Sequence, residues 1–69
     1  MNGSEIKEVR QLLGQTQEEF AHQLGVTLST VNRWENQKTV PSRLAVKQIR
    51  MLMQREGLHI PGRMISKAV

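Results

Sequence analysis

Four side chains that can contact the edges of bases lie within one short stretch of the chain. In the major groove of DNA, arginine pairs with guanine, asparagine pairs with adenine, and an aliphatic side chain contacts the thymine methyl group. The stretch offers each of these types together with a hydroxyl: Leu28, Ser29, Asn32 and Arg33. Val31 and Trp34 lie three residues apart, so on a helix they would share the opposite face. The stretch therefore predicts a helix with one face for a core and one face for base edges.

The residues before this stretch predict a helix that would position it. Thr16 can cap its start, and Glu19 lies three residues later, which is the spacing of a capping box. Three apolar side chains then fall on one helical face: Phe20, Ala21 and Leu24. Gln17 places a side-chain amide beside unpaired backbone N–H groups, which suits a phosphate oxygen. The alternative for Gln17 is a solvated helix start.

A tight turn is predicted between these two helices. Gly25 stands where a helix end favours a residue that can adopt positive φ, and Thr27 can cap the helix that follows. Val26 lies between them and can fill the angle between the helices. Residues 16–36 thus have the pattern of a helix-turn-helix, whose second helix enters the major groove.

A helix is also predicted on the N-terminal side, over residues 5–13. Ser4 can cap it, and residues 1–3 are expected to be loose. Its inner face is predicted to consist of Ile6, Val9, Leu12 and Leu13.

The longest helix is predicted over residues 43–56, from a cap at Ser42 to a stop at Gly57. Its core stripe is predicted to be Leu44, Ala45, Ile49 and Leu52. Met51 and Met53 fall outside the strict stripe, and one of them is expected to be exposed. Four helices with short connections predict an all-α bundle rather than alternating strands and helices.

The composition limits the class of protein. The 69 residues suffice for one small domain, and the absence of cysteine excludes a disulfide framework and a thiolate metal site. No apolar run approaches the roughly 20 residues of a membrane span, and the N-terminus lacks a signal-peptide core. We therefore expect a soluble, cytoplasmic protein. The formal net charge of +4 favours a polyanionic partner, although many small basic domains bind no nucleic acid.

The sequence does not predict catalysis or a cofactor. His22 has no second histidine or carboxylate at metal-ligand spacing, so an exposed side chain is favoured over a metal ligand. Adjacent carboxylates such as Glu18 and Glu19 fit the first turn of a helix, where negative charge is favourable. Glycine-rich phosphate loops and nucleophile motifs are absent from the sequence. Trp34 could stack on a base, but with Phe20 as the only other aromatic residue we favour a core position.

Several motifs together resemble one known family. The pair Thr16-Gln17, the helix-ending Gly25, the segment TLSTVNRWEN and the run from Trp34 to Pro41 make residues 6–52 similar to the phage repressor and Cro-type helix-turn-helix regulators. The resemblance implies a compact four-helix bundle like that of lambda repressor, or a five-helix bundle if the C-terminal residues add a helix. The implied function is sequence-specific binding of double-stranded DNA in transcription regulation, as a repressor.

The resemblance also implies roles for individual residues. The four base-contacting residues would lie on the helix over residues 28–36. Phosphate contacts are implied for Gln17, Thr27, Thr30, Asn36, Lys38, Thr39 and Arg43. Arg10 and Glu35 match the family's internal ion pair, which we interpret as structural. Many relatives have glycine at the position of Gln37, so we expect a different turn there, or a left-handed conformation at Asn36.

We expect residues 1–57 to form the DNA-binding domain. Residues 58–69 are expected to be a tail that is either disordered or a dimerisation segment, in which Arg63 and Lys67 could contact phosphates. One copy covers only a few base pairs, so we expect a homodimer on DNA. The alternative is an antitoxin- or coactivator-like module that uses the same fold to hold a protein partner.

Overall fold

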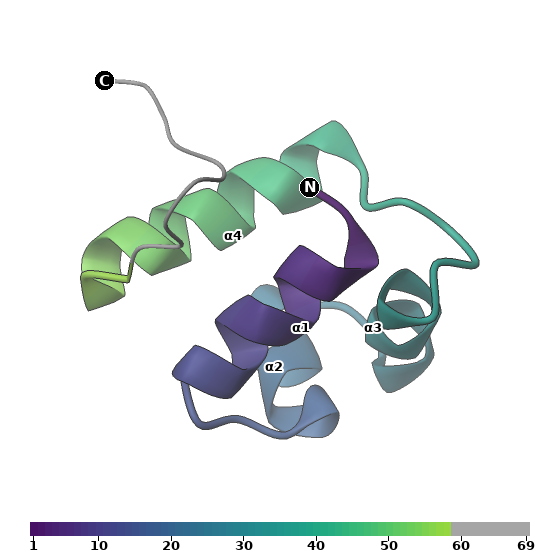
Figure 1. The fold of residues 1–69 in the computed structure, drawn as a ribbon, viewed down its shortest axis with the longest axis horizontal. Coiled ribbons are helices and arrows are strands. Elements are labelled where there is room, and N and C mark those ends of the chain that lie inside the picture. Colours follow the sequence, from purple (N-terminus) through teal and green to yellow (C-terminus); the bar gives the residue numbers. More distant parts are fainter. Residues whose placement is uncertain (59–69) are drawn as a thin grey trace.

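The computed structural model describes residues 1–58, which contain four α-helices. They are α1 (Gly3–Leu12), α2 (Gln17–Leu24), α3 (Leu28–Glu35) and α4 (Arg43–Glu56). In Figure 1, α4 runs across the top of the molecule, and the three shorter helices lie below it. The predicted all-α bundle with a central helix-turn-helix is confirmed. The expectations for the tail, including disorder, dimerisation and the phosphate contacts of Arg63 and Lys67, concern positions outside the described residues.

Three of the four helices begin at their predicted caps. The hydroxyls of Thr16, Thr27 and Ser42 each accept a hydrogen bond, at 3.1 Å, from the backbone N–H three residues later. At α2 the Glu19 carboxylate accepts a bond from the backbone N–H of Thr16 at 2.9 Å, which completes the capping box. Each cap satisfies N–H groups that have no partner within the helix, so the starts of α2, α3 and α4 follow from local sequence.

The start of α1 differs from the prediction. Asn2, rather than Ser4, is the cap: its side chain accepts from the N–H of Glu5, and the Glu5 carboxylate accepts from the N–H of Asn2, both at 2.9 Å. Gly3 lies in the first turn, buried against the end of α3, where a Cβ atom would collide with the carbonyl oxygen of Trp34. The expectation of loose residues 1–3 was therefore wrong, because a capping box and a close helix contact order them.

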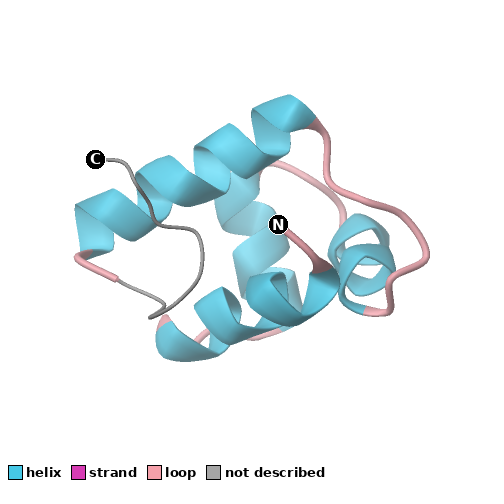
Figure 2. Cartoon of the chain, turned by 45° about the horizontal axis from the view of Figure 1, so that its top comes forward, coloured by secondary structure: helices cyan, strands magenta, loops and turns pink. Residues whose placement is uncertain are grey.

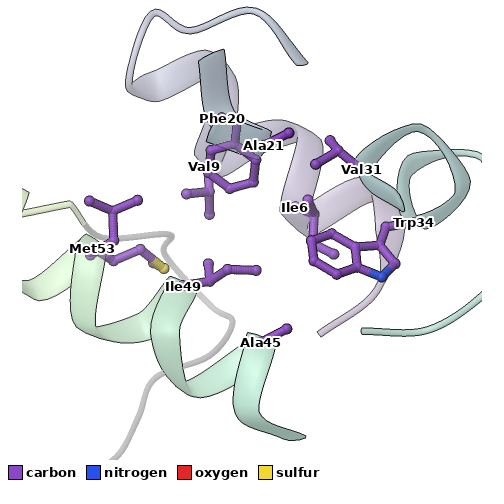
Figure 3. Close-up of a cluster of buried hydrophobic side chains, with 10 residues drawn as sticks. Ile6, Val9, Phe20, Ala21, Val31, Trp34, Ala45, Ile49 and Met53 are labelled. Carbon is purple, nitrogen blue, oxygen red and sulfur yellow. The ribbon is translucent and has the colours of Figure 1, made fainter. Parts of the chain in front are cut away.

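The core is one cluster of buried side chains contributed by all four helices (Figure 3). Its members are Ile6, Val9, Phe20, Ala21, Val31, Trp34, Ala45, Ile49, Leu52 and Met53. Leu13, Leu24 and Val26 pack against it while partly buried. The core positions predicted for Trp34 and Val31 are confirmed.

Two predicted core residues are exposed. Leu12 is 53% exposed and Leu44 is 66% exposed, so their assignment to the core was wrong. A helix turns about 100° per residue, which carries Leu44 off the face that buries its neighbour Ala45. Met53 occupies a core position on α4, and Met51 is the exposed methionine of the pair.

Candidate nucleic-acid interface

The two faces of α3 have opposite character. Val31 and Trp34 are buried, and Figure 3 shows both side chains directed into the core cluster. The four side chains predicted to contact bases are all exposed: Leu28, Ser29, Asn32 and Arg33. Leu28 is the first residue of the helix and is 48% exposed although it is apolar. The outer face of α3 thus presents donors, acceptors and one aliphatic group, while the inner face holds the helix to the bundle.

The turn that leads into α3 is short and bonded within itself. Gly25 adopts φ 74°, in the left-handed region that favours glycine. The N–H of Val26 donates to the carbonyl of Ala21 at 3.0 Å, and the hydroxyls of Thr27 and Thr30 lie 2.9 Å apart. Only residues 25–27 separate α2 from α3. Because this connection is so short, α2 and the core beneath both helices set the direction of α3.

An ion pair ties α1 to the end of α3. The Nε of Arg10 donates to one oxygen of Glu35 at 2.7 Å, and the Arg10 Nη2 donates to the other at 3.1 Å. The Arg10 Nη1 donates to the carbonyl of Gln15 at 2.9 Å, so the guanidinium also holds the α1–α2 connection. The Glu35 side chain is only 4% exposed and that of Arg10 is 14% exposed. The ion pair thus connects α1 and the residues that follow it to the end of α3.

The environment of Glu35 favours its charged form. Burial by itself raises the pKa of this carboxyl, but the hydrogen bonds from Arg10 and Gln17 lower it, as do the charges of Arg10 and Lys7. The favourable contributions prevail, and the pKa of Glu35 lies below its ordinary value. The hydrogen bond to Glu35 also raises the pKa of the Arg10 guanidinium. The pair is therefore charged at neutral pH.

Three side-chain amides extend from this ion pair across the surface. The Nε2 of Gln17 donates to the Glu35 carboxylate at 3.0 Å. The Nδ2 of Asn32 donates to the Gln17 Oε1 at 3.3 Å, and the Nδ2 of Asn36 donates to the Asn32 Oδ1 at 3.0 Å. We call Gln17, Asn32 and Asn36 the amide chain. It joins the start of α2 to the outer face and the end of α3.

The loop from α3 to α4 runs over the surface (Figure 2). The remaining residues predicted to contact phosphate are exposed there or at the start of α4: Asn36, Lys38, Thr39 and Arg43. Gln37 takes the left-handed conformation at φ 60°, whereas Asn36 keeps φ −89°. The N–H groups of Gln37 and Lys38 donate to the carbonyls of Trp34 and Arg33, at 3.0 and 2.9 Å.

This pattern at the end of α3 is a Schellman motif with glutamine where glycine is usual. The turn therefore keeps the geometry that glycine would favour, and the strained residue is Gln37 itself. The expectation of a left-handed Asn36 was wrong, because the two hydrogen bonds that close the helix require positive φ one residue later.

Sequence reasoning missed the amide chain. The bond between Asn32 and Asn36 was not predicted, although their spacing of four residues is a local signal that could have shown it. The bond between Gln17 and Asn32 has no such local signal, because it depends on how α2 docks against α3. The structure thus brings together a predicted phosphate contact, a predicted base contact and the predicted ion pair.

Other kinds of site find little support within residues 1–58. No three side chains of the His, Cys, Asp and Glu types are grouped there as a metal ion would need. No helix in this range combines the length and the apolar character that crossing a membrane demands.

Comparison with known proteins identifies the family. A helix-turn-helix family model of the Cro/C1 type matches residues 6–56, which include α2, α3, α4 and most of α1. The chain belongs to this family, whose members are DNA-binding transcription regulators rather than enzymes. The family binds double-stranded DNA. No curated protein and no solved structure gives a match to the chain.

Proposed function

We propose that the protein is a sequence-specific regulator of transcription, acting as a repressor, which inserts α3 into the major groove. The observation that carries the proposal is the division of α3 into a buried face and an exposed face. A helix fits the major groove, and the residues at its N-terminus reach deepest. Repression follows from occupancy, since a protein seated in the groove excludes others from the same site.

Base discrimination is assigned to exposed residues on α3. Arg33 can pair bidentately with guanine, which is the commonest specific contact, and each such pair contributes about 1–3 kcal/mol of discrimination. Leu28 can cover a thymine methyl group, and Ser29 can donate to or accept from a base. Asn32 stands beside them, with its amide already bonded to Gln17 and Asn36.

Contacts to the DNA backbone would set the register of α3. Gln17 and Thr27 lie at the starts of α2 and α3, where backbone N–H groups attract phosphates. The remaining phosphate contacts are proposed for Thr30, Asn36, Lys38, Thr39 and Arg43. The cations among them supply the sequence-independent part of the affinity, which falls as salt rises.

We propose that two copies bind together on DNA. One α3 spans only a few base pairs, and paired half-sites in such complexes repeat about 34–36 Å apart. Leu44 and Met51 support a dimer, because they are exposed apolar residues seven positions apart and so share one face of α4. Sedimentation with a two-half-site duplex and with a one-half-site duplex would count the copies bound.

The test is selection of preferred duplexes from a random pool, followed by titration at several salt concentrations. Arg33→Ala should lose about 1–3 kcal/mol on the selected site and relax preference at one base pair. Arg43→Ala should weaken all duplexes similarly and reduce the salt slope by about one phosphate contact. Arg50→Ala removes the same charge from an exposed position in the middle of α4 and is the matched control.

Equal losses for Arg33→Ala on selected and random duplex would contradict its proposed contact with a base. If the unchanged protein showed no salt-dependent binding even at low salt, the proposal of DNA binding would be overturned. A module that holds a protein partner would then become the better hypothesis.

A further inference from the structure

The amide chain has one end on a charged group that can only accept hydrogen bonds. An ionised carboxylate has no donor, so the Glu35 oxygen must face the NH₂ group of Gln17. The Gln17 oxygen is then turned toward Asn32, and it accepts a bond from the Asn32 NH₂ group at 3.3 Å. The Asn32 oxygen in turn accepts from Asn36 at 3.0 Å. The Glu35 carboxylate, on a side chain that is only 4% exposed, thereby sets the orientation of three amides in succession.

This arrangement engages both polar atoms of Asn32 before any DNA is present. A bidentate contact with adenine needs the NH₂ group and the oxygen of asparagine together, presented along one edge. In the structure the NH₂ group already bonds to Gln17 on α2, and the oxygen already bonds to Asn36 at the end of α3. One N–H and one oxygen lone pair of Asn32 remain, but the bonds to Gln17 and Asn36 fix the directions in which they point.

The neighbours of Asn32 gain order from it. Gln17 makes two hydrogen bonds, to Glu35 and to Asn32, although it lies at the partly exposed start of α2. A side chain held at both ends loses little further freedom when a ligand binds, so the affinity it supplies is greater. Gln17 is the residue proposed above to contact a phosphate, and its position depends on Asn32.

We propose that Asn32 is a positioning residue of the DNA interface, which holds Gln17 and Asn36 in place for backbone phosphates and does not contact a base. Base discrimination then falls to Leu28, Ser29 and Arg33. The inference rests on the proposed DNA binding and replaces the base-contacting role that the sequence predicts for Asn32.

The experiment compares Asn32→Ala with Ser29→Ala in the full chain. Both sites are exposed on α3, and alanine is the best helix former, so both variants should fold. Binding is measured on the selected duplex and on every single-base variant of it. Asn32→Ala should weaken all these duplexes by the same factor, about three- to tenfold, the range that one or two neutral hydrogen bonds supply. Ser29→Ala should instead change the preference at one base pair.

A double-mutant cycle tests whether Asn32 affects DNA binding through Gln17. In a protein that already carries Gln17→Ala, the further change Asn32→Ala should weaken binding by a smaller factor than in the unchanged protein, because only the bond to Asn36 remains to be lost. In the free protein, Asn32→Ala should also shift the NMR resonances of the Gln17 side-chain NH₂ group and leave those of Gln23 unchanged. Gln23 carries a side-chain amide near the other end of α2 and serves as the control.

The outcomes separate this inference from the proposed function. If the unchanged protein binds the selected duplex but Asn32→Ala alters preference at a single base pair, Asn32 contacts a base and the inference is overturned. Equal losses with and without Gln17 would overturn it as well. If the unchanged protein binds no duplex, DNA binding fails and the role of Asn32 in it fails too.

Discussion

The two faces of α3 differ in what a substitution there can change. The inner face carries Trp34, which is 4% exposed, and the outer face begins with Leu28, which is 48% exposed. A buried side chain contributes to the free energy of unfolding, whereas an exposed one can be replaced with little effect on it. Within the eight residues of α3, the inner face therefore determines stability and the outer face is available for recognition. Glu35, at the end of the helix, contributes to both, because its ion pair stabilises the fold and its carboxylate holds Gln17.

The outer face of α4 offers a second contrast. α3 exposes one apolar residue, Leu28, whereas α4 exposes two, Leu44 and Met51, among side chains that are mostly polar or charged. Polar groups at a surface suit a ligand such as DNA, which is itself hydrated and charged. Apolar groups on one face suit a second protein surface, and this difference underlies our proposal of a dimer.

The largest effect is expected on the inner face of α3. Trp34→Ala should lower the free energy of unfolding by about 3–5 kcal/mol, because it removes a large side chain from a closed core. Leu28→Ala on the outer face should change it by less than about 0.5 kcal/mol. Urea unfolding followed by circular dichroism measures both, since Trp34 is the only tryptophan and its loss removes the fluorescence signal. Similar losses of unfolding free energy for the two variants would show that both faces of α3 contribute to stability.

The ion pair should give stability that depends on pH. The folded-state pKa of Glu35 lies below its ordinary value, so its contribution is present above the ordinary range of a glutamate and is lost as the pH falls through the folded pKa. Glu35→Gln should lower the unfolding free energy by about 1–3 kcal/mol at neutral pH, as expected for charged hydrogen bonds. The difference in unfolding free energy between Glu35→Gln and the unchanged protein, measured by urea unfolding, should become smaller in acid.

Glu18→Gln is the matched control for this comparison. Glu18 is exposed in the first turn of α2, so its replacement should change stability by no more than about 0.5 kcal/mol. A Glu35→Gln variant whose deficit stays constant from neutral to acid pH would rule out the charge of Glu35 as the cause.

On the outer face, the contact of Leu28 can be tested from the DNA side. Replacing a thymine by uracil removes only the methyl group, and burial of one such group is worth about 0.8 kcal/mol. One thymine in the selected site should show a loss of about this size with the unchanged protein, and the loss should vanish with Leu28→Ala. Dissociation constants measured for each uracil substitution decide this. A loss that persists in Leu28→Ala would assign the methyl contact to another residue.

The smallest effect is expected where α3 ends. Gln37→Gly should raise the unfolding free energy by about 0.5 kcal/mol, because relief of the left-handed strain exceeds the added freedom of the unfolded chain. Gly25→Gln is the reverse experiment, since Gly25 adopts φ 74° and a Cβ there would meet no neighbour within 4 Å. It should destabilise the protein by about 1 kcal/mol. Thermal unfolding compares the two variants, and a destabilised Gln37→Gly would argue that the glutamine side chain has a role of its own.

Much of the candidate interface was predictable because its signals are local. The caps at Thr16 and Thr27 and the stop at Gly25 depend on residues within one turn of each other, and all three are confirmed. The exposure of Arg33 opposite Trp34 follows from helical spacing alone. The start of α1 was also locally encoded, by Asn2 and Glu5, although Ser4 offered a competing cap.

By itself, the sequence determined the helices, the tight turn and the side chains that α3 turns outward, since each depends on neighbours along the chain. Docking of the helices decided the rest. It left Leu44 exposed, brought Gly3 against the end of α3, and joined Gln17 to Asn32 across two helices. The contacts of Gly3 with α3 and of Gln17 with Asn32 link residues distant in the chain, so they depend on how the apolar faces of the helices pack into the common core.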